Sequence, residues 1–199
     1  GEWVLSTACT QAKEWQDQGF PPVRMAVNVS SLQFRRHDFV EMVEDKLRRS
    51  GLAPEWLEIE LTESLVMEDI EQGLERLTDL KVRNIKLAID DFGTGYSSLL
   101  YLKHFPFDRL KVAQEFVRDI PDDMDDVAIV EAIFAMASSL NLEVIAEGVE
   151  TRKQFDHLNA CHCSEIQGFY FSRPQSAESL SSFMRGGWAQ TDAGLCLGE

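Results

Sequence analysis

The strongest constraint on the fold is an alternation of short apolar strands and amphipathic helices that repeats six times along the chain. Each unit joins a run rich in Val, Ile and Leu to a helical pattern, which is typical of a parallel sheet. The predicted strands are 24–30, 57–61, 86–90, 109–112, 143–146 and 165–167. One helix is predicted before them at 3–18, and the others are predicted at 38–49, 70–80, 97–103, 127–140, 151–158 and 176–184.

An open doubly wound sheet and a closed barrel both fit this alternation. No glycine-rich dinucleotide turn follows the first strand. Polar residues gather at the carboxyl end of every predicted strand, where a (β/α)8 barrel builds its active site. We therefore expect an α/β fold, a TIM-like (β/α)8 barrel.

The barrel is expected to be incomplete. A full barrel has eight strands and about 250 residues, whereas these 199 residues supply six strands and open on a helix. We expect about six βα units with the N-terminal strands absent, a barrel over residues 1–185 and a flexible tail over 186–199.

Composition limits the possible partners. A formal net charge of −15 disfavours binding to a nucleic acid polymer. A hydrophobic content of 44% is enough for one core, and neither a membrane-spanning run nor a signal peptide is recognisable. We expect no membrane contact by this domain and a cytoplasmic location, although an upstream part of the parent protein could anchor it to a membrane.

The four cysteines, Cys9, Cys161, Cys163 and Cys196, are too few and too uneven for a disulfide framework. His157 and His162 lie close to two of them in sequence, but the spacing matches no paired zinc pattern. We interpret these cysteines as ordinary reduced thiols, as expected in the cytoplasm.

The strand ends carry ligand-type side chains. Carboxylate and amide oxygens suit Mg²⁺ or Mn²⁺ better than zinc, and adjacent aspartates suit a site whose two ions lie about 3.5–4 Å apart. Taken singly, each residue could belong to a turn or a solvated strand end, but six successive strands that end this way favour a shared site. The residues are Asn28, Glu60, Asp90, Asp91, Lys111, Glu147 and Gln167.

The segments around these residues resemble, in order, the motifs of one known family, and the likeness runs from Trp3 to about Met184. They are Val-Asn-Val-Ser at 27–30, Glu-Leu-Thr-Glu-Ser at 60–64, Asp-Asp-Phe-Gly-Thr-Gly-Tyr-Ser-Ser-Leu at 90–99, Leu-Lys-Val at 110–112, Glu-Gly-Val-Glu at 147–150 and Gln-Gly at 167–168. The family is that of the EAL-domain phosphodiesterases. The resemblance implies metal-dependent hydrolysis of cyclic di-GMP to linear pGpG in bacterial signalling.

The resemblance also implies a role for each matching position. Lys111 contacts the nucleophilic water, Glu150 orients Lys111, and Gln167 lies near the bound phosphate. The implied ligands of two Mg²⁺ or Mn²⁺ ions are Asn28, Glu60, Asp90, Asp91 and Glu147, with Asp90 as the bridge.

A further implied role concerns assembly. Glu63 resembles the glutamate that holds the loop from Phe92 to Ser98, which the family uses at its dimer contact, so we expect a homodimer. A sensory or GGDEF domain could precede this domain in the parent protein.

The chain departs from the family pattern at three points. Ala113 stands where the family usually has Asp, which puts full activity in question. His162 stands where the family usually has Gly, which we interpret as a surface variation. The Glu-Ala-Leu segment, which supplies a metal ligand and is followed by a substrate-holding arginine, is missing from these residues, so we expect the chain alone to be inactive.

Two alternative functions remain open. The first is a catalytically weak or inactive cyclic di-GMP receptor. The second is a sugar or aldol enzyme on a similar barrel, but its expected phosphate-binding glycine loop near the last strands is not found.

Overall fold

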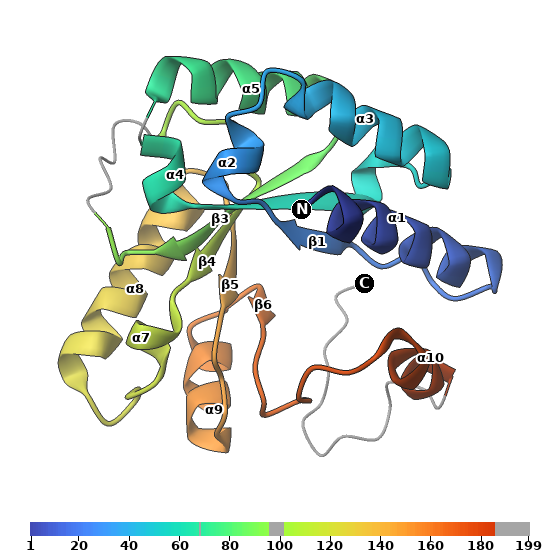
Figure 1. Cartoon of the computed structure of the whole chain (residues 1–199). Helices are drawn as coiled ribbons and strands as arrows, with labels where there is room; N and C mark the ends of the chain where they lie inside the picture. The colour runs from blue at the N-terminus through green and yellow to red at the C-terminus, as the bar shows by residue number, and fades with distance from the viewer. Residues whose placement is uncertain (68, 96–101, 186–199) are drawn as a thin grey trace.

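A computed structural model describes residues 1–67, 69–95 and 102–185 (Figure 1). Its sheet has six parallel strands in the order β1-β2-β3-β4-β5-β6. They are β1 (Met25–Asn28), β2 (Leu57–Thr62), β3 (Lys86–Phe92), β4 (Arg109–Val112), β5 (Glu143–Ala146) and β6 (Glu165–Ile166). A doubly wound sheet reverses its strand order at a switch point. The strictly sequential order excludes that alternative and is the order of a barrel wall.

Among the described residues, helical segments follow β1, β2, β4, β5 and β6 and lie on the outside of the curved sheet (Figure 1). The longer helices are α1 (Glu2–Asp17), α3 (Phe39–Ser50), α5 (Ile70–Val82), α8 (Met124–Ser139), α9 (Arg152–Ala160) and α10 (Ala177–Arg185). All six were predicted to within three residues. The predicted helix 97–103 falls mainly on residues 96–101, outside the described residues, as does the predicted tail.

Short helices that sequence periodicity did not predict follow three of the strands. They are α2 (Ser31–Phe34), α4 (Glu63–Met67) and α7 (Gln114–Val117), and a 3-10 turn, η1 (Pro54–Trp56), precedes β2. The three helices each begin within three residues of a strand's carboxyl end, so they fix the direction in which the chain leaves the sheet. The 3-10 turn lies directly before the first residue of β2.

The two faces of β2 show how the sheet is buried. Leu57, Ile59 and Leu61 are fully buried and belong to the hydrophobic core. Glu58 and Glu60 alternate with them and point to the other face, because side chains alternate along a strand. Both glutamates are nevertheless buried, since that face is the inside of the curved sheet.

The amino-terminal end of this interior holds an ion-pair network centred on Arg109, which is 5% exposed. Arg109 Nε lies 2.6 Å from Glu143 Oε2 and 3.5 Å from Glu58 Oε2, and Nη1 donates to Glu165 Oε2 at 3.0 Å. Burial raises the pKa of Glu58, although Arg109 and Arg24 oppose the shift. Arg109 therefore joins β2, β4, β5 and β6 at the end of the sheet remote from the polar strand ends.

Among residues 1–67, 69–95 and 102–185, no helix has the length and apolar character needed to cross a bilayer. Cys9, Cys161 and Cys163 are free thiols.

Candidate active site

The carboxyl ends of β1 and β2 bring the first two predicted site residues together. Parallel pairing places Asn28 opposite Glu60. The Asn28 amide Nδ2 donates to Glu60 Oε2 at 2.9 Å. This hydrogen bond fixes the orientation of the Asn28 amide, so its Oδ1 oxygen is available to another partner.

Lys111 lies at the centre of the site and is 3% exposed. Its Nζ lies 2.9 Å from Glu60 Oε1, 3.0 Å from Asp90 Oδ1 and 2.8 Å from Glu147 Oε1. Four successive strands, β2 to β5, thus direct one charged side chain each to a single point. We call Asn28, Glu60, Asp90, Asp91, Lys111 and Glu147 the strand-end cluster.

The electrostatics of Lys111 follow from this arrangement. Burial opposes its charge, but hydrogen bonds and charge from Glu147 and Glu60 outweigh burial and raise the pKa of Lys111 above its usual value. Lys111 is therefore an ammonium ion throughout the physiological pH range.

A second feature is an acidic group at the ends of β3 and β5. Asp90, Asp91 and Glu147 each present a carboxylate oxygen, and these oxygens all lie within 4.8 Å of one another. Burial raises the pKa of Glu147 and of Asp91, and Asp90 adds to the shift at both. Burial and the nearby Asp90 charge both disfavour the ionised carboxyl groups, so a cation would stabilise them.

The backbone at Asp91 turns sharply to make this possible. Asp91 has a φ of +52° and lies within a register shift between Ile89 and Phe92. Aspartate tolerates the left-handed region better than most residues. The Asp91 N–H donates to Asp90 Oδ1 at 3.1 Å, which holds both carboxylates at the same strand end.

Glu63 begins α4 and reaches the loop after β3. It is 2% exposed, and its Oε2 accepts a hydrogen bond from the Gly93 N–H at 3.1 Å. A Cβ on Gly95 would lie 2.7 Å from Glu63 Oε1, so any other residue at this position would force the carboxylate to shift. Glu63 thus contacts the described part of the loop, its predicted role in holding the whole loop stays a prediction, and residues 96–98 lie outside the described residues.

Glu150 and Gln167 lie at the edge of the site. Both are exposed. Glu150 is not one of the three described carboxylate partners of Lys111, so its predicted role in orienting that lysine stays a prediction. The Gln167 backbone pairs with β5, since its N–H donates to the Ala146 oxygen at 2.9 Å.

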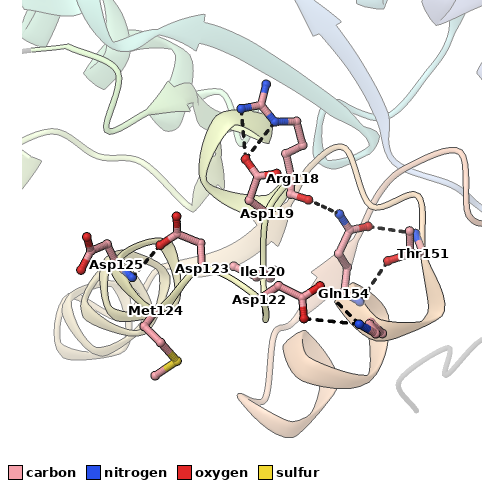
Figure 2. A pocket seen from close by; sticks show the side chains of 10 residues that line it. Arg118, Asp119, Ile120, Asp122, Asp123, Met124, Asp125, Thr151 and Gln154 are labelled. Carbon is pink, nitrogen blue, oxygen red and sulfur yellow. Dashed lines mark hydrogen bonds and ion pairs between the residues drawn. The ribbon is translucent and has the colours of Figure 1, made fainter.

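Sequence reasoning missed Gln154, which supports the loop that carries Glu147. Gln154 is 4% exposed, and its Oε1 accepts from the N–H groups of Glu150 and Thr151, both at 2.8 Å. Its Nε2 donates to the Arg118 carbonyl at 2.8 Å, as Figure 2 shows. The available signal was the capping box Thr151-x-x-Gln154 at the start of α9.

A hollow of about 730 Å³ lies beside Gln154, between the chain after α7 and the start of α9 (Figure 2). The residues that line this hollow contact one another in structural interactions, including the Lys153–Asp122 ion pair at 3.3 Å. None of its lining residues belongs to the strand-end cluster. We therefore place the chemistry at the strand ends and not in this hollow.

The geometry defines a class: an α/β barrel wall with an acidic site around a buried lysine at the carboxyl ends of its strands. The EAL domain family model matches residues 1–174. The chain belongs to the EAL-domain family.

Curated relatives agree with this assignment. The chain is 46% identical over 180 residues to the bifunctional diguanylate cyclase/cyclic di-GMP phosphodiesterase MucR of Pseudomonas aeruginosa, over 90% of this chain and 26% of MucR. It is 43% identical over 184 residues to the cyclic di-GMP phosphodiesterase NbdA of the same organism, over 92% of this chain and 24% of NbdA. The chain thus spans about a quarter of the length of each relative.

Solved structures agree on the fold. The P. aeruginosa MucR phosphodiesterase in complex with c-di-GMP matches with a TM-score of 0.88 at 46% identity, over 90% of this chain and 73% of that one. BlrP1 of Klebsiella pneumoniae, in a manganese/cy-diGMP complex, matches with a TM-score of 0.77 at 36% identity, over 85% of this chain and 43% of that one. The predicted TIM-like barrel class is confirmed.

Proposed function

We propose that this domain hydrolyses cyclic di-GMP to linear pGpG with the help of Mg²⁺ or Mn²⁺. The observation that carries the proposal is the charge balance of the strand-end cluster. Its four carboxylates face one ammonium, Lys111, which leaves a formal charge of −3. A substrate with two anionic phosphodiesters would be repelled from such a site unless divalent cations reversed its charge.

The donor set fits such ions. All the ligand atoms are carboxylate or amide oxygens, which Mg²⁺ and Mn²⁺ prefer. We propose Asn28 (through Oδ1), Glu60, Asp90, Asp91 and Glu147 as the residues that would hold the ions, and the family resemblance makes Asp90 the residue that would be shared between two ions. Ions bound there would activate water and neutralise charge on the phosphate.

Lys111 has a separate role in this proposal. The Lys111 ammonium Nζ lies within 3.0 Å of three carboxylate oxygens, so Lys111 serves as a hydrogen-bond donor and not as the base. It donates hydrogen bonds that orient the attacking water and stabilise negative charge on the phosphate. In the overall reaction, the water oxygen forms the new bond to phosphorus, and the ribose 3′ oxygen leaves and gains a proton.

The relatives support the substrate. MucR phosphodiesterase was solved in complex with c-di-GMP, NbdA is named a cyclic di-GMP phosphodiesterase, and BlrP1 was solved with manganese and cy-diGMP. We extend the substrate and the metal requirement to this chain, and we propose that Gln167 lies near the bound phosphate.

Ala113 favours one alternative, a receptor that binds cyclic di-GMP without rapid turnover. Ala113 is buried at the N-cap of α7, two residues after Lys111. The family usually has a carboxylate there, which would act on the charge or position of Lys111. Its absence would reduce catalysis more than ligand binding.

Assembly and context are part of the proposal. We propose a homodimer through the loop from Phe92 to Ser98, whose described part is fixed by Glu63. We further propose a domain over residues 1–185 within a longer cytoplasmic signalling protein that carries a sensory or GGDEF domain, as the double activity in the name of MucR suggests.

The test is turnover of cyclic di-GMP by the parent protein, since we expect these residues alone to be inactive, with pGpG measured by chromatography in Mg²⁺, Mn²⁺, Ca²⁺ or excess chelator. We expect activity with Mg²⁺ and Mn²⁺ and no activity with excess chelator. Ca²⁺ should inhibit, because its coordination is larger and more flexible.

Asp90→Asn should abolish turnover, whereas Asp125→Asn, an exposed control, should not. Tight binding without turnover would favour the receptor, and turnover in chelator would refute the metal mechanism.

A further inference from the structure

Helices α8 and α9 bring together three side chains that belong to no site described above. Glu131 lies on α8, His157 lies on α9, and Cys161 caps the end of α9. One ligand atom from each lies within 4.8 Å of the others. We call these residues the α8–α9 cluster.

The geometry of the cluster is that of a transition-metal site. His157 and Cys161 are four residues apart, so their side chains share one face of the helical turn. Cys161 Sγ lies 3.7 Å from His157 Nε2. A tetrahedral zinc ion, with bonds of about 2.3 Å to sulfur and about 2.0 Å to nitrogen, requires the two atoms to be roughly 3.5 Å apart.

The donor chemistry differs from that of the strand-end cluster. A thiolate, an imidazole and a carboxylate form a borderline-soft set, which selects Zn²⁺ over Mg²⁺ or Ca²⁺. The sequence spacing of Cys161, His162 and Cys163 did not predict zinc because the third donor, Glu131, comes from a different helix.

The surroundings leave a route to the cluster. Glu131 is exposed, and His157 and Cys161 are half-buried. Glu131 and Cys161 border a hollow of about 620 Å³, whose lining also includes Ser138 and Ser164.

We propose that Glu131, His157 and Cys161 form a Zn²⁺ site with three protein ligands, separate from the strand-end cluster, whose fourth position faces the hollow and takes water or an external donor. Cys161 would bind as thiolate and release its proton to solvent. The ion would link α8 to α9, the helices that follow the strands bearing Lys111 and Glu147. The proposal does not depend on phosphodiesterase activity.

Cobalt is the probe that separates this site from an oxygen-donor site. Co²⁺ replaces Zn²⁺ in tetrahedral sites, and only a thiolate ligand produces the sulfur-to-cobalt charge-transfer absorption in the near ultraviolet. Titration of the purified, reduced protein should give this absorption at one equivalent per chain, and Zn²⁺ should abolish it by competition. Absence of the absorption at excess Co²⁺ would overturn the proposal.

Variants identify the ligands. Cys161→Ser should remove the absorption, and His157→Ala and Glu131→Gln should each weaken Co²⁺ binding by at least about 100-fold, since even outer-shell changes cost roughly 10- to 100-fold. Glu131 is exposed, so Glu131→Gln should not affect folding. Thermal unfolding should check each variant.

Two controls lie beside the cluster. Cys163→Ser and His162→Gly should both retain the absorption and its affinity, because neither residue is one of the three donors. Asp91→Asn, in the strand-end cluster, should also retain it. An absorption that survives Cys161→Ser, or that disappears with Cys163→Ser or Asp91→Asn, would refute the ligand assignment.

Discussion

The Lys111 ammonium lies 2.8 Å from a Glu147 carboxylate oxygen, so β4 and β5 meet at the site through opposite charges. Glu60 and Asp90 approach the same ammonium at 2.9 and 3.0 Å. Without Lys111, three carboxylates would face one another inside the curved sheet. Lys111 thus organises the site as well as serving the proposed reaction.

Replacement of this lysine tests the proposed role. Lys111→Met removes the hydrogen-bond donor that acts on the attacking water and the phosphate, so turnover should fall by about 100- to 1,000-fold. Cyclic di-GMP binding in Mn²⁺ should persist, because the metal ligands remain. Lys13→Met, which breaks an exposed pair with Asp17, is the matched control. Turnover close to the unsubstituted rate would exclude the role.

The raised pKa of Lys111 predicts a pH dependence. A lysine whose folded-state pKa lies above its ordinary value of 10.5 stabilises the fold fully below that pH. The contribution is lost only as pH rises further, through the folded-state pKa. Stability of the metal-free protein between pH 7 and 10 should therefore show no step from Lys111. A step that Lys111→Met removes would contradict the raised pKa.

Arg109 should be the most sensitive position at the opposite end of the strands. Arg109→Ala leaves Glu58, which is 1% exposed, without its buried partner. The cost should be about 3–5 kcal/mol of unfolding free energy, measured by denaturant titration. The second substitution Glu58→Gln should recover part of the lost unfolding free energy by removing the buried charge.

The control is Arg118→Ala, which breaks an exposed pair with Asp119 and should cost less than about 1 kcal/mol of unfolding free energy. Equal losses at both arginines would refute the distinction.

Gln154 should couple stability to activity. Gln154→Leu leaves the N–H groups of Glu150 and Thr151 and the Arg118 carbonyl without this partner. Each buried unsatisfied group costs about 1–3 kcal/mol. Turnover should also fall because Glu147 lies on the supported loop, and the loss should appear as a higher Mn²⁺ requirement. Gln154→Glu keeps two acceptors and should recover the bonds to Glu150 and Thr151. An unchanged metal requirement would show a purely structural role.

His162 adopts a φ of +58° at the position where the family usually has Gly. The family's glycine thus has a physical reason, since L-residues are strained in this region. His162→Gly should raise stability by up to about 1 kcal/mol because it relieves this strain, despite the entropy that glycine adds to the unfolded chain. Differential scanning calorimetry would measure the change, and a lower melting temperature would show that His162 makes a stabilising contact.

The sequence predicted the strands well because apolar runs ended by polar residues mark them clearly. The bounds of β4 and β5 were predicted to the residue. The helices α2, α4 and α7 were missed because segments of four or five residues are too short to show a helical period. The strand-end cluster could be anticipated because parallel strands end on one side of a sheet. The α8–α9 cluster could not, since nothing in the sequence sets Glu131 beside Cys161.

Ala113 offers the sharpest test of what this chain has lost. Ala113 is the N-cap of α7, is 2% exposed and makes no side-chain cap. Ala113→Asp would supply a carboxylate that accepts from the N–H groups of the first turn, worth about 0.5–2 kcal/mol. It would also place negative charge two residues from Lys111, where the family usually has it.

Ala113→Asn separates these two effects, because asparagine caps a helix about as well as aspartate but carries no charge. We expect both variants to gain stability and only Ala113→Asp to raise kcat, through the position of Lys111. The measurements are thermal unfolding and the dependence of kcat on pH with Mn²⁺. Equal kcat values for the two variants would mean that the carboxylate is dispensable, and Ala113 would then be a neutral departure from the family pattern.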